Sequence, residues 1–185
     1  MIPPELPARS GSELSLAVAL LVVVAGCRTT IPVTDTTAPR VELRISGPGI
    51  GKQTMSSPPF SLWEGTDRLQ YFDLVAGAEY QFALIVSDDG GVSRAFIQMP
   101  IELEVARIWP RDVFMATDAF VRQLTVWGSR ADPRSDLSIT GRMRPRSATT
   151  VGFAFHAEGD DFGGRSGPLH RTFLSVEAFV VAAAP

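Results

Sequence analysis

Strict alternation of apolar and polar residues is the feature that most constrains the fold of this chain. Residues 79–87 read Glu-Tyr-Gln-Phe-Ala-Leu-Ile-Val-Ser, so every second side chain from Tyr80 to Val86 is apolar. Residues 41–45 repeat the pattern on a shorter scale. A period of two residues places the apolar side chains on one face of a β-strand. No ten-residue stretch after residue 40 shows the 3.6-residue period of an amphipathic helix, so this part of the chain is predicted to be all-β.

Turn-forming residues separate the predicted strands. The strand over 79–87 runs directly into Asp88-Asp-Gly-Gly91, where the glycines supply the positive φ angles that tight turns need. Two further strand-like pairs follow, residues 119–127 with 136–143 and residues 150–157 with 171–181. Short strands spaced by turn residues are typical of an antiparallel β-sandwich.

Three segments resemble bacterial immunoglobulin-like modules. Residues 35–43, Asp-Thr-Thr-Ala-Pro-Arg-Val-Glu-Leu, resemble the beginning of such a module. Residues 80–96 resemble its second strand, tight turn and third strand, and residues 151–167 resemble its closing hairpin. The resemblance implies an antiparallel immunoglobulin-like sandwich over residues 40–182.

A second resemblance gives a different division of the chain. Residues 74–80, Leu-Val-Ala-Gly-Ala-Glu-Tyr, resemble the tyrosine corner of fibronectin-type sandwiches, in which a tyrosine hydroxyl bonds to backbone a few residues earlier. This implies two small β modules, residues 40–105 and residues 106–182. The first of these is short for a seven-strand sandwich of about 100 residues, so a single domain over residues 40–182 is favoured.

An uncharged apolar run lies near the N-terminus, over residues 14–26. The run is shorter than the roughly 20 residues that a membrane-spanning helix needs. Its length is typical of the hydrophobic region of a signal peptide. We therefore expect residues 1–26 to be a cleaved signal peptide and exclude them from the fold.

The apolar run ends at Val24-Ala25-Gly26-Cys27, which resembles the lipobox of bacterial lipoproteins. The resemblance implies that the Cys27 thiol carries a covalent lipid such as diacylglycerol and that cleavage occurs just before it. Two or three acyl chains anchor a protein stably to a membrane, so we expect lipid-anchored localisation at the cell membrane. Arg28 stands where an aspartate would retain such a protein in the inner membrane, which favours the outer membrane or its periplasmic face in a Gram-negative host. Residues 27–39 are predicted to be a Thr/Pro-rich tether.

Acidic residues in two turns form the candidate metal site. In an immunoglobulin-like sandwich the loop after the second strand and the loop before the last strand lie at the same end. Asp88 and Asp89 would then neighbour Glu158, Asp160 and Asp161. Clustered carboxylates suit a hard cation such as Ca²⁺. The alternative is that these are ordinary solvated turn residues, and neither turn has the spacing of an EF-hand loop.

Catalytic residues are not expected in this chain. His170 follows Asp160, Asp161 and Ser166 closely, but the Gly-x-Ser-x-Gly motif of a nucleophile elbow does not occur. His156 is out of phase with the apolar residues of its strand and is expected to face solvent.

The three tryptophans, Trp63, Trp109 and Trp127, are either part of the core or a ligand platform, because aromatic residues at strand spacing serve both purposes. The net charge of −3 gives no basic field for nucleic acid.

Together, these observations predict a non-enzymatic, lipid-anchored lipoprotein of the cell envelope that acts as an interaction or structural module. Its partners would be the membrane and an envelope protein or glycan. One alternative is a ligand-, glycan- or calcium-binding module that uses the acidic turns. An envelope enzyme is the last alternative.

Overall fold

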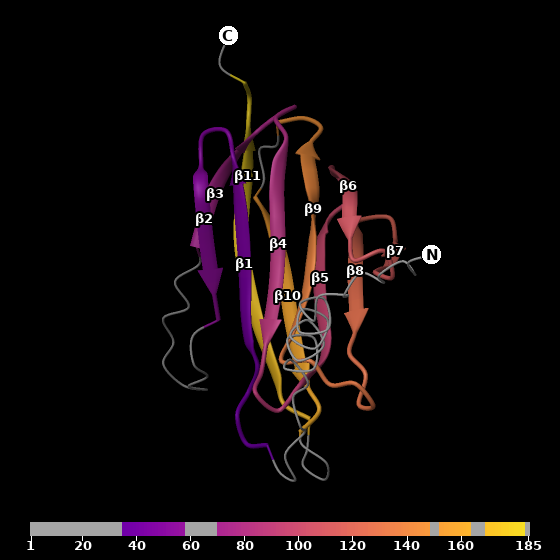
Figure 1. Cartoon of the computed structure of the whole chain (residues 1–185). Helices are drawn as coiled ribbons and strands as arrows, with labels where there is room; N and C mark the ends of the chain where they lie inside the picture. Colours follow the sequence, from indigo (N-terminus) through magenta and orange to yellow (C-terminus); the bar gives the residue numbers. More distant parts are fainter. Residues whose placement is uncertain (1–34, 58–69, 149–151, 164–168, 184–185) are drawn as a thin grey trace, which may run out of the picture.

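The computed structural model describes residues 35–57, 70–148, 152–163 and 169–183, and these residues form a β-sandwich without a helix (Figure 1). The strands are β1 (Arg40–Gly47), β2 (Gly51–Ser56), β3 (Gln70–Val75), β4 (Tyr80–Ser87), β5 (Val92–Pro100), β6 (Leu103–Trp109), β7 (Phe114–Thr117), β8 (Val121–Trp127), β9 (Asp136–Pro145), β10 (Phe153–Asp161) and β11 (Arg171–Val181).

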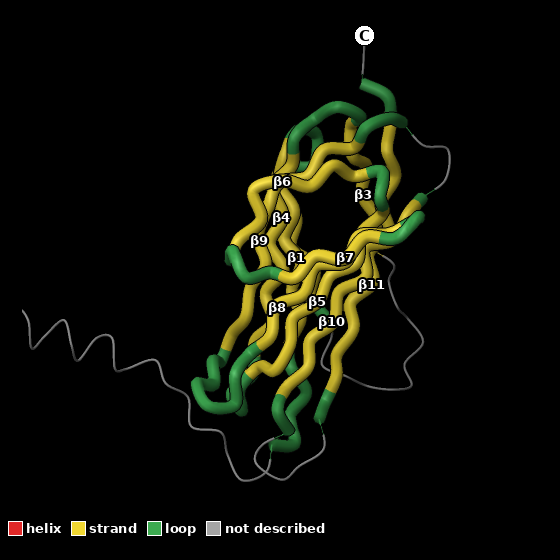
Figure 2. Tube along the Cα trace, turned by 90° about the vertical axis from the view of Figure 1, so that its right-hand side faces the viewer, coloured by secondary structure: helices red, strands yellow, loops and turns green. Residues whose placement is uncertain are grey.

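Two sheets lie face to face (Figure 2). One has the strand order β2-β1-β4-β9-β6 and the other the order β3-β11-β10-β5-β8-β7. Every pairing of these strands is antiparallel except that of β11 with β3, which is parallel. The predicted all-β, antiparallel sandwich is therefore confirmed, with one parallel pair at an edge. β3 is far from β11 in sequence, and only strands joined by a short turn are obliged to run antiparallel.

The connections between consecutive strands differ in part from the prediction. β10 and β11 pair with each other as expected. β8 and β9, which were also expected to pair, lie in different sheets, and the turn at residues 88–91 likewise carries the chain from β4 in one sheet to β5 in the other. Turn residues indicate where a strand ends. They contain no information on which sheet the chain enters next.

Four strands that sequence alternation does not reveal occupy the sheet edges. β2 and β3 lie at one side of the sandwich, and β6 and β7 lie at the other. β2 shows why they are hard to recognise, because Met55 is its only buried residue. An edge strand has a neighbour on one side only and packs few side chains into the core, so its sequence needs little apolar periodicity.

The core forms between the inward faces of the sheets. All four apolar residues predicted for one face of β4, from Tyr80 to Val86, are buried. They belong to one continuous cluster with inward residues of β1, β5, β8, β9, β10 and β11. β9 lies between β4 and β6, and β10 lies between β5 and β11. Residues 40–105 and residues 106–182 therefore share both sheets and one core, which does not fit the alternative of two separate modules.

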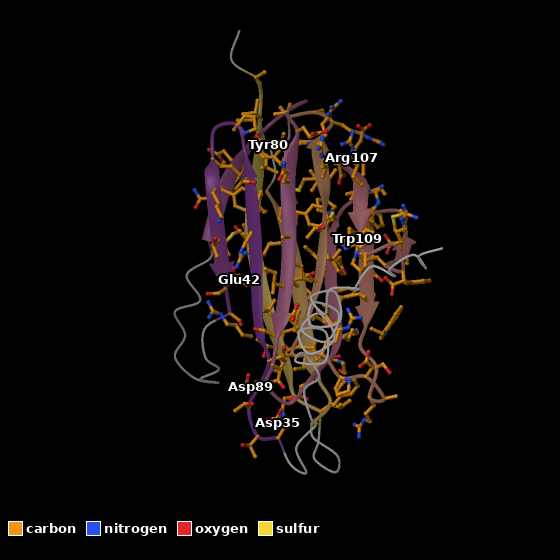
Figure 3. The ribbon with its side chains drawn as sticks, viewed as in Figure 1. Asp35, Glu42, Tyr80, Asp89, Arg107 and Trp109 are labelled. Atoms are coloured by element: carbon orange, nitrogen blue, oxygen red, sulfur yellow. The ribbon has the colours of Figure 1, made fainter. Side chains whose placement is uncertain are left out.

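Tyr80 closes one end of the sandwich, at the top of Figure 3. Its hydroxyl accepts a hydrogen bond from the Val75 amide at 2.7 Å and donates one to the Pro48 carbonyl at 3.1 Å. The geometry expected for a tyrosine corner is thus present inside a single sandwich. A Cβ at Gly47 would lie 2.4 Å from the Tyr80 ring, so the ring needs glycine at that position.

Residues 1–34, with the expected signal peptide, Cys27 and most of the tether, lie outside the described part of the chain. Trp63 and Ser166 also lie outside it. Within the described residues, no helix has the length and hydrophobicity to cross a membrane.

Candidate functional site

Three buried aspartates meet at the end of the sandwich opposite Tyr80. Asp35, Asp88 and Asp161 each offer a carboxylate oxygen, and these oxygens lie within 4.8 Å of one another. The three residues are exposed by only 7%, 7% and 0%. Asp35 precedes β1, Asp88 follows β4 and Asp161 ends β10, so three distant parts of the sequence build this carboxylate cluster. Figure 3 places Asp35 at the lower end of the molecule, far from Tyr80.

The structure brings together two of the five acidic residues considered for a cation site, Asp88 and Asp161. Asp89 is exposed beside them. Glu158 and Asp160 lie on the outward face of β10, Glu158 half-buried and Asp160 buried. Both form ion pairs with Arg94 of β5, and Asp160 Oδ1 also lies 2.7 Å from Arg171 Nε. Successive strand residues point to opposite faces, and the register shifts between Asp160 and Asp161. Asp160 therefore turns outward to arginines, whereas Asp161 turns inward.

Asp35 was not among the candidate ligands from the sequence, although it begins the segment that resembles the start of an immunoglobulin-like module. One signal could have identified it. The chain enters such a sandwich at the same end as the two acidic turns, so an aspartate just before the first strand comes close to them.

Backbone and side-chain donors hold each carboxylate in place. Asp161 Oδ1 accepts hydrogen bonds from the Gly163 and His170 amides, both at 2.8 Å, and Asp161 Oδ2 lies 2.8 Å from His170 Nδ1. Asp88 Oδ2 accepts a hydrogen bond from the Gly90 amide at 2.8 Å. Asp35 Oδ1 accepts hydrogen bonds from the Thr37 amide at 3.0 Å and the Thr37 hydroxyl at 2.7 Å.

One oxygen of the cluster has no partner. Asp35 Oδ2 is buried and makes no hydrogen bond. A Cβ at Gly90 would lie 1.8 Å from this oxygen and 3.0 Å from Asp88 Oδ2, so both oxygens converge on the space that glycine leaves open. In the described part of the chain, neither Asp35 nor Asp88 forms an ion pair with an arginine or lysine.

The crowding of carboxylates changes their acidity. Burial, followed by the close approach and negative charge of the Asp35 carboxylate, raises the pKa of Asp88 to about 7. Burial also opposes ionisation of Asp35, but the hydrogen bonds from the Thr37 amide and hydroxyl hold the pKa of Asp35 below its usual value. Asp35 is therefore the charged neighbour that makes ionisation of Asp88 unfavourable.

A second candidate site lies along the edge of the sandwich formed by β6, β7 and β8. Trp109 of β6 and Trp127 of β8 line a cleft of about 520 Å³. Both indoles are more than half exposed, at 57% and 58%. The register of β6 shifts between Ala106 and Trp109, and such a bulge re-aims the side chains that follow it. The charged residues of the cleft are Arg111, Asp112, Asp132, Arg134 and Asp136.

Further exposed apolar residues continue the surface beyond the cleft. Phe114 of β7 packs against Trp127 with 5.7 Å between the ring centroids. Met115 and Phe120 are exposed as well, by 53% and 80%. We call Trp109, Phe114, Met115, Phe120 and Trp127 together the apolar edge. Two of the three tryptophans considered for the core or for a ligand platform thus lie at the surface, and the sequence does not reveal this because aromatic residues at strand spacing occur in both settings.

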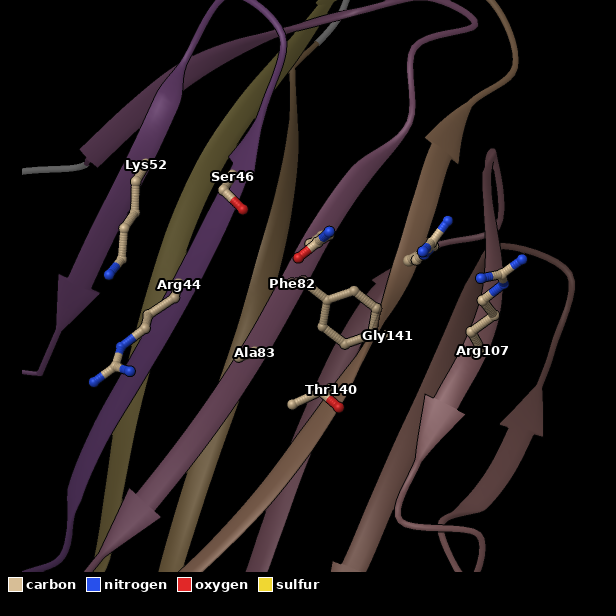
Figure 4. A pocket seen from close by; sticks show the side chains of 10 residues that line it. Arg44, Ser46, Lys52, Phe82, Ala83, Arg107, Thr140 and Gly141 are labelled. Atoms are coloured by element: carbon tan, nitrogen blue, oxygen red, sulfur yellow. The ribbon is translucent and has the colours of Figure 1, made fainter.

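A basic groove of about 410 Å³ crosses the outer face of the five-stranded sheet (Figure 4). Arg44, Lys52, Arg107 and Arg142 line it. Arg44 forms an ion pair with Glu42, and Arg142 Nη1 lies 2.6 Å from Glu79 Oε1. Acidic neighbours thus already balance two of its four cations, which makes the groove a weaker candidate than the other two sites.

The described histidines have structural partners. His170 is bonded to Asp161 as described above, and His156 stacks on Phe173 with 5.7 Å between ring centroids. Ser166, the third member of the Ser-His-Asp grouping, lies outside the described residues. The expectation of a non-enzymatic protein stays a prediction.

Comparison with known proteins gives little beyond the fold. No family model and no curated protein matches the chain. Among solved structures, the chain is similar to a non-cellulosomal cohesin from the hyperthermophilic archaeon Archaeoglobus fulgidus, with 13% sequence identity and a TM-score of 0.38. The match covers 60% of this chain and 86% of that protein. At this similarity no residue role is transferred from the cohesin to this chain.

Proposed function

We propose that this chain is a non-enzymatic binding module of the cell envelope, anchored to a membrane through lipid on Cys27, which contacts a protein partner through the apolar edge. The observation that carries the proposal is the exposure of five large apolar side chains on β6, β7, β8 and the turn between β7 and β8, at one side of the sandwich. Trp109 and Trp127 line one cleft and Phe114 packs on Trp127, and exposed apolar clusters of this kind mark interaction sites on globular domains.

The composition of the apolar edge favours a protein as partner. Tryptophan, phenylalanine, methionine and arginine are the residue types enriched in protein interfaces, and tryptophan and arginine dominate their binding free energy. Trp109 and Trp127 supply the aromatic anchors, and Arg111 and Arg134 lie beside them in the same cleft. The paired phenyl and indole rings of Phe114 and Trp127 form a ready-made apolar contact next to this cleft.

The expected anchor leaves this edge accessible. Asp35 follows Cys27 by eight residues. A lipid on Cys27 would therefore hold the end of the sandwich that contains the carboxylate cluster, here called the acidic end, within at most about 29 Å of the membrane. The apolar edge runs along the side of the sandwich. Its Trp127 end adjoins the turn at residues 88–91, whereas Trp109 lies well away from Asp35 (Figure 3). A partner in the aqueous space could therefore approach the Trp109 part of the edge without meeting the membrane.

Site-specific photo-crosslinking in the native host tests the proposed interface. A photoreactive amino acid at Phe120, in the apolar edge, is expected to crosslink one defined protein. The same amino acid at Phe173, an exposed aromatic position on β11, serves as the matched control. Crosslinking of the same proteins from both positions would contradict a specific interface at this edge.

Affinity measurements with the captured partner then quantify the interface. Trp109→Ala and Trp127→Ala are each expected to weaken binding by about tenfold or more, because truncating a central aromatic anchor costs about 2 kcal/mol. Phe173→Ala is expected to leave the affinity unchanged. Equal affinities for wild type and both tryptophan variants would overturn the proposal.

A glycan is the second candidate ligand, favoured by the cleft itself. Its volume of about 520 Å³ falls in the range of small-ligand sites, about 300–1,000 Å³, and two indoles offer flat apolar faces beside charged groups. Binding of envelope oligosaccharides by the purified protein, lost in Trp109→Ala and kept in Phe114→Ala, would favour a glycan over a protein partner.

The lipid anchor has its own test. Metabolic labelling with palmitate is expected to mark the wild-type protein and not the Cys27→Ser variant. Equal labelling of the two proteins would refute the anchor, and it would leave the binding role of the apolar edge to be judged by the crosslinking experiment.

A further inference from the structure

We propose that Asp35, Asp88 and Asp161 bind one calcium ion, and that this ion fastens the N-terminal segment to the end of the sandwich. The proposal is independent of the apolar edge. It rests on the spacing of the three carboxylates, on one buried oxygen without a partner and on the donors that orient each ligand.

The spacing of the carboxylates suits a single calcium ion. Calcium binds oxygen at about 2.3–2.6 Å, so two ligand oxygens on opposite sides of the ion lie about 4.6–5.2 Å apart. Oxygens of Asp35, Asp88 and Asp161 all lie within 4.8 Å of one another. One ion can therefore contact all three carboxylates without a change in the fold, with water or backbone carbonyls completing its coordination.

The unpartnered oxygen of Asp35 is an independent sign of a missing ligand. Asp35 is 93% buried, and its Oδ2 atom makes no hydrogen bond. A buried charged oxygen without a partner is unfavourable in an ordinary core and is rare in native structures. This oxygen instead points toward Asp88, another carboxylate, over the space left open by Gly90. A cation between the two carboxylates supplies the partner that the protein itself does not provide.

Each carboxylate is already oriented for binding. Metal-binding carboxylates are characteristically hydrogen-bonded by surrounding groups that fix their direction. Here Thr37 holds Asp35, the Gly90 amide holds Asp88, and His170 together with the Gly163 amide holds Asp161. Because these donors are in place before an ion arrives, binding requires little ordering of side chains.

The donor set favours calcium over zinc. All three candidate ligands are carboxylate oxygens, which hard cations prefer, whereas zinc sites use mainly histidine and cysteine. The nearby His170 uses Nδ1 to hold Asp161. Magnesium needs near-ideal octahedral geometry and gives up its bound water reluctantly, so it is expected to bind this carboxylate cluster less strongly.

A bound ion would join three parts of the chain. Asp88 and Asp161 belong to the ends of β4 and β10, in opposite sheets, and Asp35 belongs to the segment that leads back to Cys27. Calcium would thus fix the direction in which the tether leaves the sandwich. In the lipid-anchored protein it would also set how the domain is held relative to the membrane.

Calorimetry and thermal melts of the full chain test this site directly. The protein, purified in detergent and freed of metal with a chelator, is titrated with calcium chloride and separately with magnesium chloride. We expect one calcium ion per chain with a Kd of about 10⁻⁴–10⁻³ M, as in extracellular modules. The melting temperature is expected to rise by about 5–10 °C at a calcium concentration about 100 times the Kd. Magnesium is expected to give a smaller rise.

Matched variants separate this cluster from general surface acidity. Asp35→Asn keeps the shape of the side chain and is expected to weaken calcium binding by about tenfold or more. Asp89→Asn, one residue away from Asp88 and exposed, is expected to leave calcium binding unchanged. If Asp35→Asn does not fold, Gly90→Ala provides the second test, because its methyl group occupies the space on which the Asp35 and Asp88 oxygens converge.

Hydrogen exchange tests whether the ion fastens the N-terminal segment to the end of the sandwich, a role that we call the clamp. Calcium is expected to slow exchange of the amides in residues 35–40 in the wild type and not in Asp35→Asn. The absence of both binding heat and a melting shift at about 10 mM calcium would overturn the site. Equal weakening by Asp35→Asn and Asp89→Asn would assign binding to surface charge and overturn it as well. Calcium binding without slower exchange in residues 35–40 would overturn the clamp.

Discussion

At one end of the sandwich the Tyr80 hydroxyl is bonded on both sides, to the Val75 amide and to the Pro48 carbonyl. At the other end, the carboxylate cluster buries three acidic groups, and Asp35 Oδ2 is left without a partner. In both arrangements, buried polar atoms connect loops to the core. Neutral groups can be satisfied completely by nearby backbone, whereas several carboxylates in one place need positive charge that backbone does not supply. The comparison predicts that the tyrosine end is purely structural and that the acidic end depends on a cation.

The largest expected effect comes from Asp161→Ala at the acidic end. The substitution removes the acceptor for the Gly163 and His170 amides and for the His170 ring. We expect the free energy of unfolding to fall by about 3 kcal/mol, because buried donors lose their acceptor. Urea denaturation measures this change, and Asp89→Ala, an exposed control, is expected to stay within about 0.5 kcal/mol of wild type. Similar losses in both variants would show that Asp161 is not a structural acceptor.

A pair of glycine substitutions compares the two ends directly. A methyl group at Gly47 meets the buried Tyr80 ring at 2.4 Å, and one at Gly90 meets the end of the Asp35 side chain at 1.8 Å. The Tyr80 ring is enclosed by the core and cannot shift aside. Gly47→Ala is therefore expected to lower the free energy of unfolding by about 2 kcal/mol. Asp35 can turn outward to solvent, so Gly90→Ala without calcium is expected to cost less than about 1 kcal/mol. Equal losses of unfolding free energy for Gly47→Ala and Gly90→Ala, measured by urea denaturation with chelator present, would contradict the expected difference between the two ends.

Tyr80→Phe is expected to have the next largest effect. It leaves the Val75 amide and the Pro48 carbonyl without their partner and should lower the free energy of unfolding by about 1–2 kcal/mol. Because no ion is involved at this end, the rise in melting temperature on adding calcium should equal that of the wild type. A reduced calcium response in Tyr80→Phe would mean that the two ends are coupled.

The smallest expected change is a gain in the free energy of unfolding rather than a loss. Asp35→Asn replaces the unpartnered oxygen by an amide group that can donate to Asp88, and its own oxygen can still accept from Thr37. In the presence of chelator, this variant is expected to be more stable than the wild type by about 0.5–1 kcal/mol. In saturating calcium the order should reverse, because only the wild type gains stability from the ion. Lower stability of Asp35→Asn under both conditions would assign Asp35 a purely structural role.

The site could be anticipated from the sequence only in part. The acidic turns suggested that Asp88 and Asp161 come together, and they do. Glu158 and Asp160 were grouped with them because they are close in sequence, but strand alternation and the shift after Asp160 place them on the outward face of the sheet, paired with arginines. Asp35 was missed because distance along the chain does not report which end of a fold a segment enters. The exposure of Trp109 and Trp127 was equally hidden, since the same aromatic pattern occurs in core strands.

By itself, the sequence determined that the chain after residue 40 is a β-sandwich and which face of β4 is buried. The reason is that a two-residue period places all the apolar side chains on one face of a strand, which must then face the core. It also predicts the signal peptide and the lipid on Cys27, which stay predictions. Only the tertiary structure decided which strands share a sheet, that β3 runs parallel to β11, and that Asp35 reaches Asp88 and Asp161. Periodicity reports whether a residue is buried, whereas a binding site depends on which buried residues meet, and only the packing of the two sheets settles that.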